Sequence, residues 1–324
     1  MKSILGMGNA LVDVLIVTTD DKLLTNYSLP KGSMQHVDEL TAEKIYNEIK
    51  ASASVVPGGS AANTTVGMAQ LGLNTGFLGK VGNDELGKVF DDNLKQFNVK
   101  SLLMKSSVGT GRAMVIISSD SERTFSVYLG AAIEVKPENV TPELFEGYDI
   151  LHIEGYLIQD HNLIEKAMKT AKELGKKVSL DLASYNVVDD NIDFLKDVVK
   201  KYADIVFANE EEAKSFTGKD AEEALDIIAG MCEIAIVKTG AKGSLIKQGN
   251  NIYTVNAEKV PPVDCTGAGD LYASGFLYGL SMGKSIETCG VIGTICASEV
   301  IQVIGPKLSS ETVTKIKEKI NRLP

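Results

Sequence analysis

Short β-rich runs alternate with amphipathic helical patterns along most of this chain, and this alternation constrains the fold more than any other feature. In the middle of the chain the β-rich runs lie at residues 149–153, 177–181, 203–207 and 234–237. The helical patterns lie at residues 161–174, from about residue 210, and at 221–230, 268–280, 285–303 and 309–321. A helix between two strands lets them lie parallel in one sheet. We therefore predict an α/β fold with a three-layer αβα core and a mostly parallel sheet.

Two segments interrupt the alternation. Residues 12–37 carry strand and turn signals, and residues 109–129 have the pattern of a hairpin that turns at residues 119–122. A few strands that cannot join a main sheet often form a lid. We predict a single domain, residues 1–324, with a small β-sheet lid formed by about 12–37 and 109–130.

The composition limits the class of protein. Hydrophobic residues make up 44% of the chain and charged residues 23%, which is ordinary for a globular protein. The net charge of −10 and the lack of a long basic block argue against a nucleic-acid partner. The four cysteines show no Cys-x-x-Cys spacing, which indicates neither a disulfide framework nor a zinc site. We expect a cytoplasmic protein that acts on small molecules, as a monomer or a homodimer.

The N-terminal residues 1–17 are apolar enough to suggest a signal peptide. However, Asn9 and Asp13 interrupt this run, and no small-residue cleavage site follows it. We therefore predict a buried first strand. No uninterrupted apolar run approaches the roughly 20 residues that span a bilayer, so no membrane partner is expected.

The segment Asp264–Asp270, with the sequence DCTGAGD, carries the clearest chemical signal. Gly267 and Gly269 let the backbone on either side of Ala268 approach an anion at a helix start, where the helix dipole adds roughly half a positive charge. Asp270, on the first turn, can accept the proton of a hydroxyl that lies over the same loop. The combination predicts phosphoryl transfer to an alcohol. A glycine-rich turn that merely starts a core helix is the structural alternative.

Two other segments can contact the alcohol. The paired Gly58 and Gly59 let a ligand approach the backbone before a helical pattern, whose start Ser60 is expected to cap. Asn9 and Asp13 lie where the first strand emerges, and a carboxamide with a carboxylate can donate to and accept from vicinal hydroxyls. Each segment taken alone also fits an ordinary turn.

Two further segments suit a nucleotide and its metal ion. Asn209 and Glu212 are three residues apart at a helix start, so both can address one site, for which we predict Mg²⁺ bound through its water molecules. Thr239, Gly240 and Gly243 belong to a loop between two strands, whose backbone can run along a nucleotide. A charged helix start and a simple β-turn are the structural alternatives.

In order and spacing, these segments resemble the PfkB, or ribokinase-like, family of carbohydrate and nucleoside kinases. The resemblance covers nearly the whole chain, and Asp264–Asp270 is its most specific part. Residues Gly8–Asp13 are similar to adenosine kinases, in which the asparagine lies four residues before the aspartate, whereas ribokinases usually have it two before. The resemblance implies a ribokinase-like fold, ATP as phosphoryl donor and Mg²⁺. It also makes a potassium ion near the Asp264 loop a further candidate cofactor.

The same resemblance implies roles for individual residues. Asp270 would be the general base, and Arg123 a lid arginine that reaches the phosphates. The acceptor would be held by Asn9, Asp13, Gly58, Gly59 and Asn63, and its base would be surrounded by Phe125, Val127, Leu129 and Tyr156. The contacts of ATP would be Asn209, Thr239, Gly240, Gly243, Gly267, Ala268 and Gly269, with Asn209 and Glu212 organising the magnesium ion.

A physical argument also favours a nucleoside acceptor. Phe125, Val127 and Leu129 alternate along a predicted strand, so they share one face and form an apolar surface that suits a purine. We predict an ATP-dependent kinase that phosphorylates the 5′-hydroxyl of adenosine or a related nucleoside. Two alternatives stay open: a sugar kinase of the same family acting on ribose, fructose or a keto-sugar acid, and a non-catalytic nucleoside- or sugar-binding protein.

Overall fold

A large, mostly parallel sheet forms the centre of the computed structural model, which describes residues 2–120 and 122–323. Within these residues the sheet has nine strands in the order β14-β13-β12-β11-β10-β9-β1-β5-β6. The strands are β1 (Ile4–Met7), β5 (Thr75–Gly82), β6 (Lys100–Ser106), β9 (Ile150–Glu154), β10 (Lys177–Asp181), β11 (Ile205–Asn209), β12 (Ile234–Lys238), β13 (Ser244–Gln248) and β14 (Asn251–Val255). Only β13 and β14 run antiparallel to their neighbours. The predicted parallel α/β sheet is confirmed.

Helices cover both faces of this sheet, because alternate strand residues point to opposite sides. Leu151 and Ile153 contribute to one apolar cluster, and Ile150 to the other. On the first face lie α5 (His161–Glu173), α7 (Ile192–Tyr202), α8 (Glu210–Thr217) and α9 (Ala221–Ala229). On the second face lie α3 (Ser60–Leu71), α10 (Ala268–Ser281) and α11 (Ile286–Val300), with α12 (Ser310–Asn321) packed outside them.

Shorter elements complete the core. Helix α4 (Glu85–Gln96) packs with α3 and β5 in a separate apolar cluster, and α6 (Tyr185–Asp190) precedes α7. The 3₁₀ turns are η1 (Gly130–Glu134), η2 (Pro137–Asn139), η3 (Pro142–Phe145), η4 (Gly155–Gln159) and η5 (Gly240–Lys242). No helix in the described part of the chain is long and apolar enough to cross a membrane.

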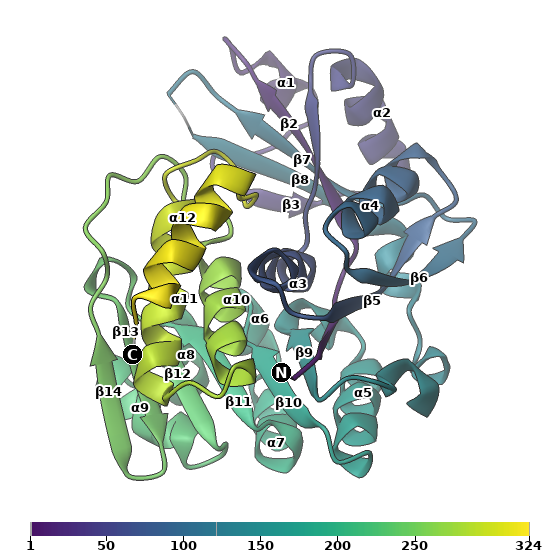
Figure 1. Ribbon diagram of the computed structural model, residues 1–324. Helices are drawn as coiled ribbons and strands as arrows, with labels where there is room; N and C mark the ends of the chain where they lie inside the picture. The colour runs from purple at the N-terminus through teal and green to yellow at the C-terminus, as the bar shows by residue number, and fades with distance from the viewer. Residues whose placement is uncertain (1, 121, 324) are drawn as a thin grey trace.

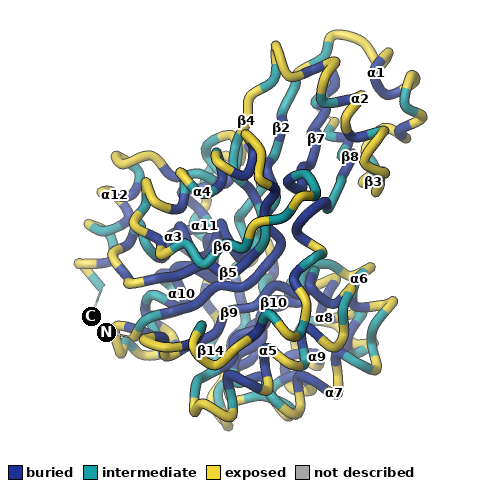
Figure 2. Tube along the Cα trace, turned by 90° about the vertical axis from the view of Figure 1, so that its right-hand side faces the viewer, coloured by how far each residue is buried: buried dark blue, intermediate teal, exposed yellow. Residues whose placement is uncertain are grey.

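A second, five-stranded sheet stands away from the large one (Figures 1 and 2). Its strand order is β3-β8-β7-β2-β4, and its strands are β2 (Leu11–Val17), β3 (Met34–His36), β4 (Ser54–Pro57), β7 (Gly111–Ile117) and β8 (Arg123–Tyr128). Helices α1 (Lys22–Asn26) and α2 (Glu39–Ile49) cover its outer face. The predicted hairpin is present as β7 and β8, although Ser121 in its turn lies outside the described residues. Strand β4 lies outside the two segments predicted for the lid.

The expected single first strand within residues 1–17 is wrong. The apolar run is divided into β1 of the large sheet and β2 of the small sheet, with a break at residues 8–10. At this break the Asn9 N–H donates to the Glu154 carboxylate at 2.8 Å instead of to a neighbouring strand. A Cβ atom on Gly8 would lie 2.4 Å from the same carboxylate, so the chain can turn there only because residue 8 is glycine.

The chain passes between the two sheets at residues 8–10, 58–59, 107–110 and 129–130. The strand ends at these passages form one row across the base of the small sheet. In that row Val12 lies opposite Pro57 and Arg112, and Arg112 lies opposite Tyr128. Each passage contains glycine: Gly8, Gly58 and Gly59, Gly109, and Gly130.

Candidate active site

Polar side chains collect at the edge of the large sheet where its parallel strands end. The chain leaves β1 at Asn9, while Glu154, Asp181 and Asn209 are the last residues of β9, β10 and β11, and Lys238 that of β12. In open α/β sheets ligands bind in the crevice outside these carboxyl ends. Parallel strands bring these residues together although more than two hundred positions separate the first from the last.

Helix α10 begins at this edge and carries Asp270 on its first turn. Gly267 is its N-cap with φ +77°, and a Cβ atom there would lie 2.5 Å from Pro306 Cβ, so the tight entry requires glycine. The Ala268 N–H donates to the Cys265 carbonyl at 3.2 Å. The helix N-terminus therefore points into the site, although this particular N–H is already hydrogen-bonded.

The Asp270 carboxylate is held by two residues of α3. Ser60 Oγ donates to one carboxylate oxygen at 2.7 Å, and Asn63 Nδ2 donates to the other at 2.9 Å. Burial raises the pKa of Asp270 to about 6, against the lowering effect of these two hydrogen bonds. A carboxylate with such a pKa is a competent general base near neutral pH.

The expected capping role of Ser60 is wrong. Gly59 is the N-cap of α3, and the Ser60 hydroxyl instead reaches across to Asp270. Gly59 has φ +88°, and a Cβ atom on it would lie 2.4 Å from the Asn9 carbonyl oxygen. A Cβ atom on Gly58 would lie 2.6 Å from the Asp13 carboxylate. The paired glycines thus bring the loop against Asn9 and Asp13.

A cavity of about 510 Å³, which we call the acceptor cavity, lies between the inner face of the small sheet and the C-terminal loop. It is lined by Asp13, Leu15, Val17, Ser52, Ser54, Val56, Val115, Ile117, Arg123, Phe125, Thr266, Ile304, Gly305, Pro306 and Lys307. Burial raises the pKa of Asp13 to about 7; the positive charges of Lys307 and Arg123 oppose this shift, and the Asp270 carboxylate adds to it. The negative charge of Asp270 therefore contributes to the raised pKa of Asp13.

Arg123 connects the small sheet to the Asp264–Asp270 loop. Its guanidinium pairs with the buried Asp264 carboxylate at 2.9 Å and donates to Thr266 Oγ1 at 2.8 Å. The same Asp264 carboxylate accepts from the Gly305 N–H at 2.7 Å. The arginine is thus bound to the loop that begins α10.

The residues predicted to surround a base do not share one cavity. Phe125 lines the acceptor cavity, whereas Val127 and Leu129 line a separate hollow of about 330 Å³ beside His36. Leu129 lies beyond the end of β8, so strand alternation does not apply to it. Tyr156 lies in η4 and donates its hydroxyl to the Ala183 carbonyl at 3.3 Å.

A second cavity, of about 420 Å³, lies over the start of α10, and we call it the phosphate cavity. It is lined by Ser60, Tyr156, Asp181, Ala183, Asn209, Glu212, Lys238, Gly240, Cys265, Gly267, Ala268, Gly269 and Asp270. Lys238 pairs with Asp181 at 2.9 Å. Burial opposes its charge, but the carboxylates of Asp181 and Glu212 raise the pKa of Lys238. A fixed ammonium group therefore faces this cavity.

Asn209 and Glu212 form a capping box at the start of α8. The backbone N–H and the Nδ2 of Asn209 donate to the two Glu212 carboxylate oxygens at 2.7 and 2.6 Å. Burial raises the pKa of Glu212 to about 7, against the positive charge of Lys238. Only 2% of Glu212 is exposed, so its carboxylate is not a solvated group of the helix start.

The oxygen donors of this cavity suit Mg²⁺, which keeps several of its water molecules in protein sites. No cluster of three or more His, Cys, Asp or Glu residues within the described residues could hold a metal ion directly. Both Glu212 oxygens also accept hydrogen bonds from Asn209. The residues therefore fit an ion held through its waters and the phosphates, with Asn209, Glu212 and Asp181 beside it.

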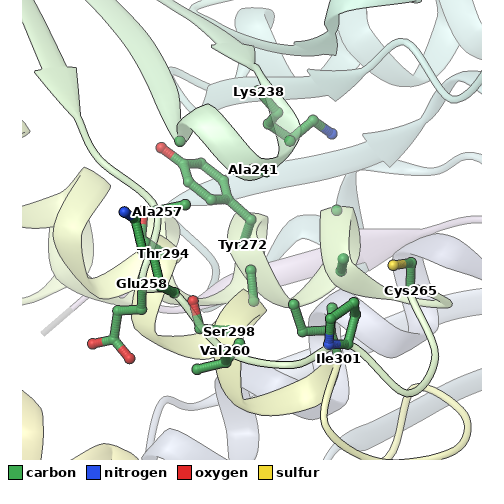
Figure 3. Close-up of a pocket in the computed structure, with 17 residues that line it drawn as sticks. Lys238, Ala241, Ala257, Glu258, Val260, Cys265, Tyr272, Thr294, Ser298 and Ile301 are labelled. Carbon is green, nitrogen blue, oxygen red and sulfur yellow. The ribbon is translucent and has the colours of Figure 1, made fainter.

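A third cavity, of about 660 Å³, adjoins the phosphate cavity and shares Lys238, Gly240, Cys265, Ala268 and Gly269 with it (Figure 3). We call it the nucleotide cavity. Its other lining residues are Ala241, Gly243, Ala257, Glu258, Lys259, Val260, Pro262, Tyr272, Thr294, Ala297, Ser298 and Ile301. Thr239 is buried beneath it, where its backbone N–H donates to the Gly243 carbonyl at 2.8 Å.

Comparison with known proteins identifies the family. The model of the pfkB family carbohydrate kinases matches residues 34–313. The chain therefore belongs to the pfkB carbohydrate kinase family. It is a phosphotransferase of the kind that uses a hydroxyl acceptor, and the kinase and ribokinase-like fold predicted from the sequence are confirmed.

Relatives of two kinds are similar to this kinase. A probable sugar kinase from Rhizobium etli CFN 42 has 35% identity and a TM-score of 0.88 over 98% of this chain and 99% of its own. The adenosine kinase from Sinorhizobium meliloti has 32% identity and the same TM-score and coverage. The 5-dehydro-2-deoxygluconokinase of Bacillus subtilis has 29% identity over 82% of this chain and 86% of its own length.

Several residues at the site were not predicted from the sequence. Asp181 and Glu154 end buried strands, so the rule that sites lie at carboxyl ends of parallel strands could have found them. Lys238 follows the same rule at the end of β12. Lys307 and the walls of the nucleotide cavity at 257–262 and 294–301 carry no such local signal.

Proposed function

We propose that this kinase transfers the γ-phosphoryl group of ATP to the 5′-hydroxyl of adenosine or a related nucleoside. One observation carries the proposal: Asp270 lines the phosphate cavity, and the residues that hold its carboxylate, Ser60 and Asn63, directly follow the Gly58–Gly59 loop that lies against Asp13 of the acceptor cavity. A base at the junction of two cavities can take a proton from a hydroxyl in one and direct the oxygen towards a phosphate in the other.

The surrounding residues supply positioning and charge. The acceptor's hydroxyls are held by Asp13 and the Gly58–Gly59 loop, and Asn63 and Ser60 keep the Asp270 carboxylate in one orientation. Lys238, Arg123 and the N-terminus of α10 offset the negative charge of the transferring group. Bound Mg²⁺ would add charge neutralisation at the phosphates. Because the transition state is loose, positioning and charge account for most of the acceleration.

The apolar wall of the acceptor cavity favours a nucleoside over a free sugar. Leu15, Val56, Val115, Ile117 and Phe125 all line it. Burying a purine face against such a wall contributes a few kcal/mol, on the scale of about 25 cal/mol per Å² of apolar area. The name of one relative, the Sinorhizobium meliloti adenosine kinase, also supports a nucleoside acceptor.

The second candidate is a sugar-acid kinase, and one feature of the cavity favours it. Lys307 and Arg123 place two cationic groups among its lining residues, and either can pair with a carboxylate of an acceptor. The name of the Bacillus subtilis relative, a 5-dehydro-2-deoxygluconokinase, points in this direction.

A substrate panel separates the two. Product formation from ATP should be measured with adenosine, guanosine, ribose, fructose and 5-dehydro-2-deoxygluconate under identical conditions. We expect adenosine to exceed ribose and fructose in kcat/KM by at least about 10²-fold, since each 1.4 kcal/mol is about tenfold. Replacing Phe125 and Val115 together with serine should narrow that gap. Better turnover of a sugar or sugar acid than of any nucleoside would replace the first candidate by the second.

A further inference from the structure

The C-terminal loop Gly305–Pro306–Lys307 is fixed to the segment that carries the catalytic base. The Gly305 N–H donates to the Asp264 carboxylate at 2.7 Å. Pro306 lies so close to Gly267 that a Cβ atom there would meet it at 2.5 Å. A residue on this loop therefore keeps a constant position relative to the start of α10 and Asp270.

Lys307 belongs to this loop and is one of the residues that line the acceptor cavity, as Asp13 is. Its Nζ donates to Asn93 Oδ1 of α4 at 3.0 Å, which anchors the far end of the side chain. Burial lowers the pKa of Lys307 to about 8, and the negative charge of Asp13 opposes that shift. In turn, Lys307 is the strongest of the charges that stabilise ionised Asp13. Asp13 and Lys307 therefore place opposite charges in one cavity.

A carboxylate alone is an incomplete partner for a pair of hydroxyls. It accepts their protons but leaves the oxygen lone pairs unsatisfied, and an unsatisfied buried acceptor is costly. An ammonium group has three donors, of which Asn93 accepts one. The remaining donors can meet the hydroxyl oxygens.

We propose that Lys307 is a specificity-determining residue of the acceptor site, which donates to the same vicinal hydroxyl pair whose protons Asp13 accepts. This inference rests on the proposed function, since it takes the cavity around Asp13 as the place where the acceptor binds. It assigns the site to neutral acceptors with two adjacent hydroxyls and predicts discrimination against deoxy analogues.

The test compares Lys307→Met and Lys307→Arg with wild type, using adenosine, 2′-deoxyadenosine and 3′-deoxyadenosine as acceptors. Lys219→Met, in the exposed turn between α8 and α9, is the matched control. Lys307→Met should raise the KM of adenosine at least about tenfold, the usual scale for a hydrogen bond to a charged group, and leave the KM of ATP unchanged. The loss that wild type shows with the deoxy analogues should shrink by a similar factor. Lys307→Arg should restore part of both effects.

A pH profile separates this role from a merely structural one. The charged groups that act on Asp13 are Lys307, Asp270 and Arg123. Removing the positive charge of Lys307 raises the pKa of Asp13, so the acidic limb of kcat/KM for the acceptor should move to higher pH in Lys307→Met. Lys307→Gln, which is also neutral, should show the same movement and serves if the methionine variant does not fold.

The inference is overturned if a folded Lys307→Met or Lys307→Gln enzyme retains the wild-type KM for the acceptor and the full penalty for deoxy analogues. It is also overturned if the variants lose turnover equally with every acceptor and the arginine variant rescues nothing. Failure of the proposed function looks different: wild type then phosphorylates none of the nucleosides. If the panel instead finds a sugar acid as the best acceptor and Lys307→Met abolishes only that preference, Lys307 pairs with a carboxylate and the inference fails.

Discussion

Among the individual residues, Asp270 is central to the proposed function. Its carboxylate is buried but receives hydrogen bonds from Ser60 and Asn63. Burial makes the carboxylate more basic, while the two donors fix its direction and limit the shift of its pKa. A free carboxylate in water has neither property. The combination suits the role of general base near neutral pH that we propose for this side chain.

Replacing Asp270 with asparagine should separate activity from stability. The change removes the proton acceptor, so turnover should fall by about 10²-fold or more with little change in acceptor KM. The folded-state pKa of about 6 lies above the ordinary aspartate pKa of 3.8, so the cost of burying this charge is fully present above pH 6. The melting temperature at pH 7.5 should therefore not fall, and we expect it to rise. Steady-state kinetics and thermal denaturation check both parts, and near-normal turnover would remove Asp270 from its role.

Ser60→Ala tests the hydrogen bond that was not expected from the sequence. Losing a donor to the ionised form raises the pKa of Asp270 further above about 6. The acidic limb of kcat/KM should thus move to higher pH, with activity at pH 8 reduced least. A pH profile from 5 to 9 measures this shift. A limb that stays in place would mean that Ser60 acts only in packing.

The role of Glu212 is best tested by replacing it with glutamine. Alanine would also remove the capping box of α8, which would lower the free energy of unfolding by about 1 kcal/mol. Glu212→Gln should raise the Mg²⁺ concentration for half-maximal activity several-fold without lowering the melting temperature. Glu210→Gln, at the exposed start of the same helix, is the control and should not change the titration. Superimposable titrations for both variants would assign Glu212 to helix capping alone.

Individual site residues were foreseeable where their chemistry is local. The Asp264–Asp270 segment joins the anion site and the base in seven consecutive residues, so the sequence alone indicates both. The contact of Ser60 depends on packing between α3 and α10, and that of Lys307 on packing between the C-terminal loop and α4. No pattern within a single segment encodes such contacts, and Ser60 at a helix start resembles a cap.

At the scale of elements, the small sheet presents one face to the acceptor cavity and packs the other against α1 and α2. Predicting its hairpin was straightforward because β7 and β8 are adjacent in the chain. Strand β4 was missed because it has four residues, none of them buried, and pairs only with β2, from which α1, β3 and α2 separate it in the chain. The division of β1 from β2 was missed because both are apolar, and only tertiary contacts of Gly8 and Asn9 separate them.

The predicted lid role of the small sheet makes an exchange experiment informative. Amides of β2, β4, β7 and β8 should exchange more slowly when the acceptor binds, because the cavity that they line becomes filled. Amides of β10 and β11, deep in the large sheet, provide the internal control and should not change. Hydrogen exchange followed by mass spectrometry checks this, and equal protection with and without acceptor would make the small sheet part of a static core.

At the scale of the whole molecule, the nucleotide and phosphate cavities adjoin one another at one edge of the large sheet, and the acceptor cavity lies between the small sheet and the C-terminal loop. Shared lining residues connect the first two, and Asp270 and Thr266, both in the DCTGAGD segment, lie at the second and the third. A family model that covers most of the chain agrees with one continuous kinase unit. The chain as a whole has a net charge of −10, so the cationic groups of these cavities are a local exception to its overall negative charge.

Ligands that fill these cavities should stabilise the molecule as one unit. At a concentration of 100 times Kd a ligand adds about 2.7 kcal/mol to the free energy of unfolding. For a chain of this size, that corresponds to a rise in Tm of roughly 4 °C. Adenosine together with a non-hydrolysable ATP analogue and Mg²⁺ should therefore shift a single calorimetric transition. Two transitions, of which only one moves, would contradict this prediction.

The four glycine-containing passages between the sheets restrict how the small sheet can move. Because their strand ends form one row across its base, the row acts as an axis with four attachment points. A body attached along a line can rotate about that line, but it cannot slide sideways or twist without straining several attachments at once. If the small sheet acts as the predicted lid, these attachments leave it one angular coordinate. Asp13 and Arg123 would then move on the same arc, and opening would have to break the ion pair between Arg123 and Asp264.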